Sequence, residues 1–452
     1  MTFLTGALGF VIAIAVLVTI HEYGHFWMAR RLGMQVQRFS VGFGKPLWVR
    51  KGADGTEYAL SAIPIGGYVS FADPEGELTP EQIARSYNHR PPFQRILVLL
   101  AGPLANFLFA IVAYWALLAV GTPAFKPVVG EIKADSPAAI AGLHSGDRIV
   151  AVGDDRVKTQ EGAVLAILDR VIAGEAVKVE LKAPDGGERE TTLEIEGERR
   201  SLTEPGALLP GLGFDWWYPE VPPVVGQVVA GSPAERAGLR PGDRIVAIDG
   251  RPTRDFLAMV AAVQPNPGKT LRFTIERGGK QFDQPIEVEG QRDKDRLVGR
   301  IGVQQAPGAP MPESMRTVER YGPLEAVGPA IARTWAMSAL TVRMIGKLLV
   351  GEVSVKNLSG PISIAEVAGF SLRQGILSFL TTLGILSVSL FVLNLLPIPI
   401  LDGGQIVFRL AEVVKGRPLS ERAQAVGQQI GIVLLLVLMS FAFYNDLSRL
   451  FS

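Results

Sequence analysis

Residues 19–26 read TIHEYGHF and close a stretch, residues 3–20, in which no side chain is charged. A helix of about 20 mostly apolar residues is long enough to cross a bilayer core. Ionisable side chains at the end of such a span are rare and usually functional. Side chains four residues apart lie on one helix face, so His21 and His25 can both point at one metal ion, with Glu22 beside the first. The sequence therefore predicts a polar site at the end of a membrane-spanning helix.

This spacing is the H-E-x-x-H arrangement found in zinc metalloproteases. It predicts that His21 and His25 are zinc ligands, because zinc accepts imidazole nitrogens and lowers the pKa of its bound water to about 7. Glu22 would then be the catalytic acid/base, taking a proton from that water and passing it to the leaving amine. The alternative is that the two histidines pack by chance on a polar helix face, but their place at the end of a span favours the metal site.

A catalytic zinc site needs a third protein ligand. His89 lies in a basic loop and His144 aligns with Arg240 of a repeat described below, so neither is a good candidate. Asp402 is the single acid in residues 394–404, NLLPIPILDGG, which end another apolar stretch. Its simpler role would be to start a turn, because the prolines and glycines around it break the helix. A helix broken at membrane depth is costly unless the freed backbone groups line a polar cavity, which favours Asp402 as the third ligand.

The composition of the 452-residue chain agrees with a membrane protein that carries a polar part. Charged residues make up 20% of the chain, and the mean hydropathy of +0.26 is high for a soluble protein. The formal net charge is +1 and the sequence pI is about 7.9, without the basic excess of nucleic-acid-binding proteins. There is no cysteine, which excludes disulfides and thiolate metal sites.

Four stretches are long and apolar enough to be transmembrane helices. They are residues 3–20, 96–120, 375–401 and 430–444. The first could be a cleaved signal peptide, but it lacks a basic beginning and a small-x-small cleavage site, which favours a retained span. Lys and Arg near the span ends predict that residues 29–95 and 402–427 are cytoplasmic, since cytoplasmic loops are enriched in these residues. The segment 121–374 and both termini are then expected outside the cytoplasm.

This topology brings the two parts of the predicted metal site to one side of the membrane. The first and third spans both run inward, so His21, His25 and Asp402 all reach the cytoplasmic end. If residues 322–350 were a further span, the third span would run outward and Asp402 would lie on the opposite side. Three basic residues interrupt that segment, and a charge at mid-bilayer costs about 2.5–3.5 kcal/mol. We therefore expect residues 322–350 to form an amphipathic helix on the membrane surface.

Two segments between the second and third spans repeat each other. Residues 130–151 read GEIKADSPAAIAGLHSGDRIVA, and residues 226–247 read GQVVAGSPAERAGLRPGDRIVA. A turn, a short helix ending at glycine, a second turn and a β-branched strand follow in order. With the later strands GLGF (211–214) and RIGV (300–303), this pattern resembles circularly permuted bacterial PDZ domains. PDZ domains bind peptide C-termini by strand addition. Alternatively, the repeats are spacers, or they block bulky substrates from a membrane site.

HEYGH in the first span, AGPLANF (101–107) in the second, the tandem PDZ units and NLLPIPILDGG together resemble the site-2 protease family of intramembrane zinc metalloproteases. The resemblance covers nearly the whole chain. The zinc-site residues that it implies are His21, His25 and Asp402 as ligands and Glu22 as the catalytic acid/base. It also implies that Asn394 contacts the substrate backbone and that Asn106 has a supporting role.

The resemblance further implies a membrane-associated β-hairpin region after the first span, here roughly residues 36–72, with Gly42, Phe43 and Gly44 as substrate-binding residues. A membrane-spanning substrate must unwind before water can attack it, and its unpaired backbone groups are costly in lipid. A sheet edge at Ser40–Gly44 would accept the unwound strand, with Asn394 on its other side.

The activity implied by the resemblance is cleavage of single-pass membrane proteins in the inner membrane of a bacterium. The expected substrates are anti-sigma factors already shortened outside the cytoplasm by another protease, or signal-peptide remnants. A competing hypothesis is a membrane-anchored PDZ adaptor with a structural zinc site, which would not need Glu22. A metal transporter is less favoured, because transporters place their ligands at mid-bilayer within repeated spans.

The predicted fold is a multi-domain integral membrane protein with four transmembrane helices, a membrane-associated β region and two tandem extracytoplasmic PDZ domains (α+β). The expected segments are transmembrane helix 1 with HExxH (1–30), the cytoplasmic-side β-hairpin region (31–95), transmembrane helix 2 (96–120), PDZ domain 1 (121–217), PDZ domain 2 (218–308), an extracytoplasmic linker with an amphipathic helix (309–374), transmembrane helix 3 with the LDG motif (375–404), a cytoplasmic loop (405–427) and transmembrane helix 4 (428–447). The expected partners are the lipid bilayer, protein substrates and peptide C-termini, and not nucleic acid.

Overall fold

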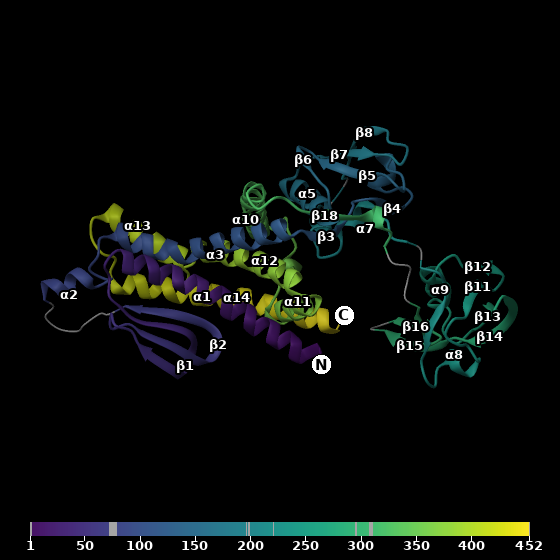
Figure 1. Cartoon of the computed structure of the whole chain (residues 1–452), viewed down its shortest axis with the longest axis horizontal. Coiled ribbons are helices and arrows are strands. Elements are labelled where there is room, and N and C mark those ends of the chain that lie inside the picture. Colours follow the sequence, from purple (N-terminus) through teal and green to yellow (C-terminus); the bar gives the residue numbers. More distant parts are fainter. Residues whose placement is uncertain are drawn as a thin grey trace.

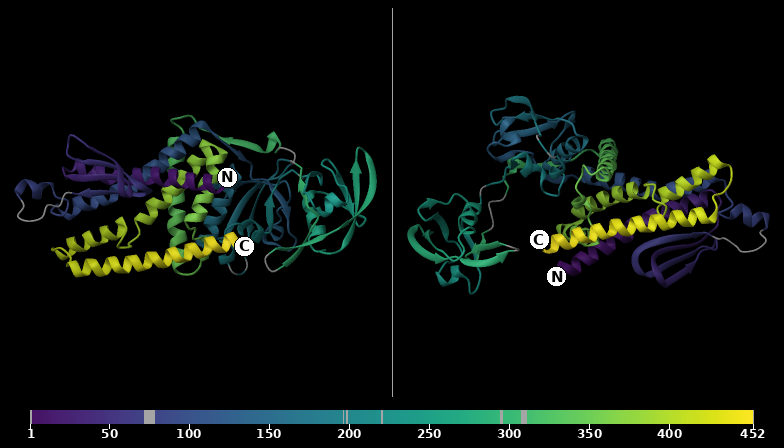
Figure 2. Two further views of the ribbon diagram at one scale, coloured as in Figure 1. Left: turned by 90° about the horizontal axis from the view of Figure 1, so that it is seen from below. Right: turned by 180° about the vertical axis from the view of Figure 1, so that it is seen from behind.

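The four predicted spans correspond to four long helices in the computed structural model, which describes residues 2–71, 79–195, 197, 199–219, 221–293, 296–306 and 311–451. These helices are α1 (Thr2–Arg31), α3 (Pro92–Val120), α12 (Ile376–Asn394) and α14 (Glu421–Phe451). Each is long and apolar enough to cross a bilayer. They run along the long axis of the molecule, with both chain ends at the same end of the bundle (Figure 1, Figure 2).

The bundle is built around α3, which contacts both α1 and α12. Tyr114 and Leu117 of α3 are buried together with Val388 of α12. The helix α11 (Pro361–Gln374) lies against α1, and glycine permits the close approach. A Cβ atom at Gly9 would lie 2.8 Å from the Ala368 carbonyl oxygen, so a larger residue there would push the two helices apart.

The segment around the third span differs from the prediction. The helix α12 ends at Asn394, and a second helix, α13 (Asp402–Lys415), follows where the sequence predicts a loop over residues 405–427. The helix α14 also begins within that segment, at Glu421. The charged residues of α13 and its two glycines lower its hydropathy, which hides it from a search for apolar spans. Asp402 is thus the first residue of a helix rather than the end of one.

The predicted amphipathic helix within residues 322–350 is present as α10 (Val327–Leu349), and it is not one of the four apolar helices. It runs across the direction of the bundle and is seen nearly end-on in Figure 1. Ala330 is buried among residues of α3, whereas Ile331 and Trp335 are exposed. One side of α10 therefore covers the bundle and the other is an uncovered apolar stripe.

The β region after the first span is an antiparallel hairpin of β1 (Val36–Lys51) and β2 (Glu57–Phe71), followed by α2 (Pro80–Arg85). Both strands bend, so the hairpin folds over into four rows of backbone. The order of these rows across the sheet is 46–51, 57–61, 36–41 and 67–71. The hairpin lies alongside the bundle next to α1 (Figure 1).

This folding corrects the predicted substrate-binding edge. Ser40 pairs with Ala59 on one side and Tyr68 on the other, and Val41 is paired on both sides as well. The expectation of a free edge at Ser40–Gly44 is therefore wrong for these two residues, because their row is an inner one. The outer row on that side of the sheet is 67–71, which has strand partners on one side only among the described residues.

The two sequence repeats fold in the same way. The first contains β4 (Val129–Ile132), α4 (Pro137–Ile140), β5 (Arg148–Val152), β6 (Asp155–Arg156), α5 (Gln160–Ala173), β7 (Val177–Lys182), β8 (Glu188–Leu193), α6 (Arg199–Leu202), α7 (Leu208–Leu212) and β9 (Phe214–Trp216). The second contains β10 (Val225–Val228), α8 (Pro233–Arg236), β11 (Arg244–Ile248), β12 (Arg251–Pro252), α9 (Phe256–Val263), β13 (Thr270–Arg277), β14 (Lys280–Glu287), β15 (Glu289–Asp293), β16 (Arg296–Arg300) and β17 (Val303–Gln305). The sheet order β6-β5-β7-β8 in the first matches β12-β11-β13-β14 in the second, and β4-β9 matches β10-β17. Each repeat has its own apolar core.

The first repeat is attached to the bundle, whereas the second extends away from it (Figure 1). The strand β3 (Thr122–Phe125), directly after α3, pairs with β18 (Arg316–Glu319), which follows the short helix η1 (Glu313–Met315). Arg333 of α10 lies 2.8 Å from Glu161, and Arg343 lies 2.6 Å from Asp169, both on α5. These contacts fix the first repeat against α10.

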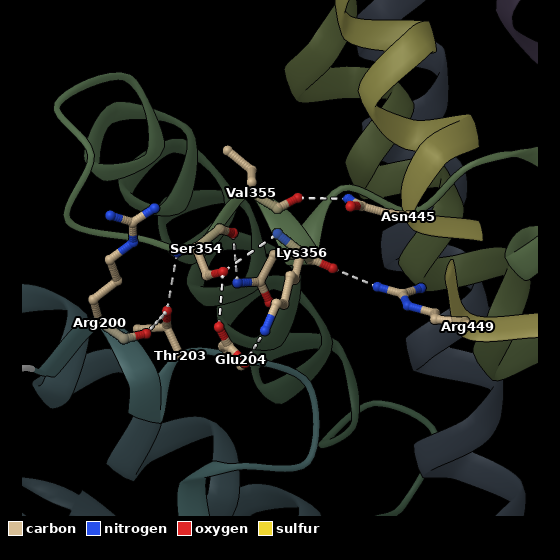
Figure 3. A network of polar contacts seen from close by, with 9 residues as sticks. Arg200, Thr203, Glu204, Ser354, Val355, Lys356, Asn445 and Arg449 are labelled. Carbon is tan, nitrogen blue, oxygen red and sulfur yellow. Dashed lines mark hydrogen bonds and ion pairs between the residues drawn. The ribbon is translucent and has the colours of Figure 1, made fainter. Parts of the chain in front are cut away.

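A second attachment joins the first repeat to α14 through the turn after α10 (Figure 3). This turn contains the short helix η2 (Val355–Asn357). The backbone N–H of Ser354 donates to Thr203 Oγ1 of the first repeat at 3.3 Å. From the other side, Asn445 Nδ2 of α14 donates to the Val355 carbonyl at 2.7 Å. The turn therefore bridges the repeat and the last helix.

Candidate metal centre

The two histidines of HEYGH lie on one face of α1, as their spacing predicts. Their Nε2 atoms are 3.2 Å apart. His25 Nδ1 is 2.8 Å from the Val98 carbonyl of α3, to which it can only donate, so the proton sits on Nδ1 and the lone pair of Nε2 is free. A hydrogen bond of this kind fixes the ring orientation of a metal-binding histidine.

Two glycines let α1 and α3 approach closely enough for this contact. A Cβ atom at Gly24 would lie 2.2 Å from the Ala101 carbonyl oxygen, and one at Gly102 would lie 2.3 Å from His25 Nε2. Any side chain at either position would displace the histidine or separate the helices. The sequence shows both glycines, one inside HEYGH and one inside AGPLANF, but not that each lies against the other helix.

Asp402 reaches the same point from a broken helix. After α12 ends at Asn394 the chain turns, and α13 starts at Asp402. Glycines allow the turn to fold back on α13, because a Cβ atom at Gly404 would lie 2.1 Å from the Ile398 carbonyl oxygen. Gln405 Nε2 donates to the Pro399 carbonyl at 2.7 Å and closes the turn. The chain thereby turns the Asp402 carboxylate toward α1.

The three donor atoms lie at the corners of a small triangle. His21 Nε2 is 3.1 Å and His25 Nε2 is 3.4 Å from Asp402 Oδ2, and the histidines are 3.2 Å apart. Tetrahedral zinc with bonds of about 2.0–2.1 Å separates its ligand atoms by roughly 3.3 Å. Asp402 Oδ2 is also buried without a hydrogen bond to any described residue. Two imidazoles and one carboxylate, with a fourth position open, are a donor set that fits catalytic zinc.

Glu22 shares a cavity of about 330 Å³ with the three donors. Val69, in the outer row of the β region, lines the same cavity as Glu22. A Cβ atom at Gly67 of the same row would lie 3.3 Å from Glu22 Cγ. The residues that line the cavity are His21, Glu22, His25, Tyr68, Val69, Phe71, Tyr87, Val98, Leu99, Asn394, Ile400, Leu401 and Asp402. The outer sheet row thus passes directly over the acid/base candidate.

The two predicted asparagines lie on different sides of the site. Asn394 lines the cavity, where a bound peptide could reach its amide. Asn106 is fully buried behind His21, with its Nδ2 atom 3.4 Å from His21 Nδ1 and its Oδ1 atom without a partner among the described residues. The assignment of amide N and O is interchangeable by rotation, and the rotated amide would accept a hydrogen bond from His21 Nδ1. The Ser387 hydroxyl of α12 donates to the backbone carbonyl of Asn106 at 2.8 Å.

The predicted segment Gly42–Gly44 does not line the cavity. Gly42 and Gly44 have φ angles of 91° and 84° and form the bend of β1. Phe43 stacks on Tyr68, with ring centroids 6.1 Å apart, so it touches a residue that does line the cavity.

Eight of the lining residues are not among the predicted site residues, and four of these lie outside the transmembrane helices and the turn before Asp402. Three of them, Tyr68, Val69 and Phe71, come from the outer row of the sheet, and Tyr87 stacks on Phe71 at 4.5 Å. Burial is the largest influence on the Tyr87 hydroxyl and raises its pKa. The alternation in YVSF predicts a strand, but only the way the hairpin folds over shows which row reaches the site.

Comparisons with known proteins match the chain to a family over most of its length. The family described as "Peptidase family M50" matches residues 9–438. The chain is 40% identical over 453 residues to the regulator of sigma-E protease RseP of Escherichia coli, and 40% identical over 457 residues to protease RseP of Yersinia pestis. It is also 40% identical over 453 residues to a protein of Pasteurella multocida named as a zinc metalloprotease. In each case 100% of both chains is covered.

A match to a solved structure concerns a fifth of the chain. The PDZ domain of an SdrC-like protein from Listeria monocytogenes is 23% identical, and the match covers 20% of this chain and 92% of that one with a TM-score of 0.17. A likeness this slight does not decide the fold of either repeat.

The match to the M50 family extends from α1 to α14, and therefore includes both segments that meet at the candidate centre. The matches to the E. coli and Y. pestis relatives cover the whole of both chains. The chain therefore belongs to peptidase family M50, the site-2 proteases, and is a membrane zinc metalloprotease of that type.

Proposed function

We propose that His21, His25 and Asp402 hold one zinc ion and that Glu22 is the acid/base of an intramembrane peptide hydrolysis. The observation that carries this proposal is the convergence of three donor atoms, 3.1–3.4 Å apart, from two segments far apart in the sequence. Glu22 lies in the same cavity and is not needed to complete the metal triangle. A structural site would have no use for it, which favours the protease over the adaptor.

The residues of the site divide the chemical work. Zinc bound there supplies Lewis acidity, which makes an attacking water acidic enough to lose a proton near neutral pH. Glu22 accepts that proton and carries it to the amine of the broken peptide bond. His25, held by the Val98 carbonyl, keeps its lone pair directed at the centre. Asn106, behind His21, supports the ring of that ligand in the same way.

The substrate strand binds beside the outer row of the β region. A transmembrane helix must unwind before its peptide bonds can react, and an unwound strand in lipid needs new hydrogen-bond partners. Row 67–71 passes close to Glu22 and has strand partners on one side only among the described residues, so strand addition on its other side would present the peptide bond to the site. Asn394 binds the substrate backbone from the other side of the cavity. Gly42, Phe43 and Gly44 act indirectly, since Phe43 supports Tyr68 of that row.

The substrates are single-pass membrane proteins of the bacterial inner membrane. Two relatives are named regulator of sigma-E protease, which favours an anti-sigma factor as one substrate, and signal-peptide remnants are a second class of single membrane helix. The two repeats are PDZ domains on the extracytoplasmic side. In support of this placement, they and both chain ends lie at the end of the bundle opposite α13 (Figure 1). There they exclude substrates whose outer domains are still intact.

The catalytic proposal is tested by comparing the full chain with Glu22→Gln in detergent micelles. Substituting a general base typically costs 10²–10⁴-fold in rate. We expect cleavage of a tagged single-span substrate to fall by about that factor while zinc content stays at the wild-type level. Equal cleavage by both proteins, or loss of zinc from Glu22→Gln, would contradict the assignment of Glu22 and favour a structural site.

The exclusion role is tested by removing the second repeat. The second repeat is chosen because the first contacts α10 and the turn that is bound to α14, so removal of the first would disturb the bundle. We expect a chain that lacks residues 221–306 to cleave a substrate with an intact outer domain, whereas the full chain should not cleave that substrate. A substrate without an outer domain, cleaved equally by both chains, is the control. Unchanged substrate choice would show that this repeat does not filter.

A further inference from the structure

A cluster of three buried charges lies on the side of α3 that faces α13. Glu412 of α13 lies 2.7 Å from Arg95 of α3 and 2.6 Å from Arg409 of its own helix. The side chains of Arg95, Glu412 and Arg409 are 9%, 3% and 12% exposed. None of the three lines the cavity of the metal centre. The mechanism proposed above makes no use of them.

Stability alone is a poor explanation for this cluster. Removing ions from water is expensive, and well-packed apolar residues in the same place are often equally or more stable. Both guanidinium Nε atoms are also buried without a partner among the described residues. The geometry that the cluster enforces is a better explanation than its energy.

The ion pair between Arg95 and Glu412 connects the two helices that carry the two halves of the site. Asp402 begins α13 and Glu412 lies near its end, roughly 15 Å along a rigid helix. Arg95 is in the first turn of α3, and the Val98 carbonyl that holds His25 is in the next turn. The start of α3 therefore contacts both halves, one through His25 and the other through Glu412.

Tyr87 shows how near the cluster is to the site. It lines the cavity together with Asp402. Burial raises the pKa of its hydroxyl, and the charges of Arg409 and Arg95 lie near enough to lower it, so the cluster is close to the cavity.

We propose that Arg95 is a positioning residue, whose ion pair with Glu412 sets the rotation and height of α13 and thereby places Asp402 against His21 and His25. This proposal rests on the zinc site proposed above. Arg409 also neutralises Glu412, but it lies on α13 itself and does not join the two helices. Arg95 and Arg409 thus differ in their link to α3, although both are buried and both pair with the same carboxylate.

The matched pair Arg95→Met and Arg409→Met tests this difference. Each variant removes one cation and leaves Glu412 with the other. Zinc affinity is measured on the full-length proteins in micelles by competition with a chelator, together with thermal stability. Loss of a group that orients a metal ligand typically weakens metal binding 10–100-fold. We expect about a tenfold weaker zinc affinity for Arg95→Met and wild-type zinc affinity for Arg409→Met, at similar thermal stability.

Cleavage kinetics give a second readout. With zinc in excess, a misplaced Asp402 should lower kcat of Arg95→Met for a single-span substrate and leave KM unchanged, because the substrate contacts lie elsewhere. Arg95→Lys keeps the charge and should restore zinc affinity in part. If Arg95→Met does not fold, Arg95→Lys and Arg409→Lys provide the same comparison with the charges kept.

The outcomes separate this proposal from the site on which it rests. Equal zinc affinity for the two arginine variants overturns the positioning role and leaves the zinc site intact. A wild-type chain that binds no zinc, or that keeps it in His21→Ala, overturns the zinc site itself. A drop in stability for both arginine variants with unchanged zinc affinity would identify the cluster as structural only.

Discussion

The two halves of the proposed metal centre are built in different ways. His21 and His25 are placed by local helix geometry, since residues four apart on α1 face the same direction. Asp402 is placed by tertiary structure: α12 stops, a turn of residues 395–401 intervenes, and a new helix starts at the ligand. The first half needs only that α1 be a helix. The second half depends on the turn and on the packing of α13 against α3. We therefore expect the position of Asp402 to be disturbed more easily than that of the two histidines.

Substitution at Gly404 should give the largest loss of cleavage and zinc, because a side chain there would collide with the backbone of the turn that places Asp402. A Cβ atom there would lie 2.1 Å from the Ile398 carbonyl oxygen, which cannot move without opening the turn. Displacement of a reacting group by about 1 Å can cost 10²-fold in rate. We expect Gly404→Val to lose about that much cleavage and most of its zinc, measured by substrate assay and metal analysis.

Gly346→Val is the matched control, since Gly346 lies in the helix α10 with no atom within 4 Å of an added Cβ. It should cleave and bind zinc as the wild type does. If Gly404→Val kept wild-type activity, the turn would tolerate bulk, and the contrast between the two halves would be lost.

Removal of zinc should loosen one half and leave the other. The backbone hydrogen bonds of α1 close within the helix, whereas the turn before Asp402 has short-range bonds such as that from Leu401 N–H to the Ile398 carbonyl at 2.8 Å. A ligand stabilises whatever must be ordered to bind it. We expect amide hydrogen exchange of residues 395–405 to rise about tenfold in chelator, with little change in residues 19–26.

The Glu22→Gln protein is the proper sample for that exchange measurement, because we expect it not to cleave other copies of the chain. Equal acceleration in both segments would mean that the metal holds α1 as much as the turn, and the two halves would then be alike.

Substitution at Gly102 should give the smallest effect of the three. An added Cβ would lie 2.3 Å from His25 Nε2, but the atom it meets belongs to a side chain that can rotate. We expect Gly102→Ala to weaken zinc affinity several-fold and to preserve the fold, as followed by chelator competition. Gly6→Ala, where the added Cβ would make an ordinary contact of 3.4 Å, is the control on α1. If Gly102→Ala lost as much zinc as Gly404→Val, the two histidines would be displaced as easily as Asp402.

The difference between the halves also explains what the sequence could predict. Helix periodicity is local, so the pairing of His21 with His25 follows from spacing. Asp402 could be predicted as a candidate because a broken apolar helix with one acid is unusual. The meeting of Gly24 and Gly102 with their neighbours could not be predicted, since close approach depends on how two helices cross.

The β region shows the same limit. The alternating residues of β1 and β2 predict strands, but a strand's neighbours depend on how the hairpin bends. The prediction of an edge at Ser40 was therefore wrong, and row 67–71 takes that place. The link between Arg95 and Glu412 was likewise hidden, because these residues are far apart in the chain and α13 was not predicted as a helix.

We propose that two distant segments hold a single hydrolytic zinc ion, and the zinc content of Asp402→Ala is the decisive measurement. We expect about one zinc per chain in the wild type, since the three donors form one site, and nearly none in Asp402→Ala or His25→Ala at the same free-zinc concentration. A folded Asp402→Ala protein that holds zinc as tightly as the wild type would contradict it.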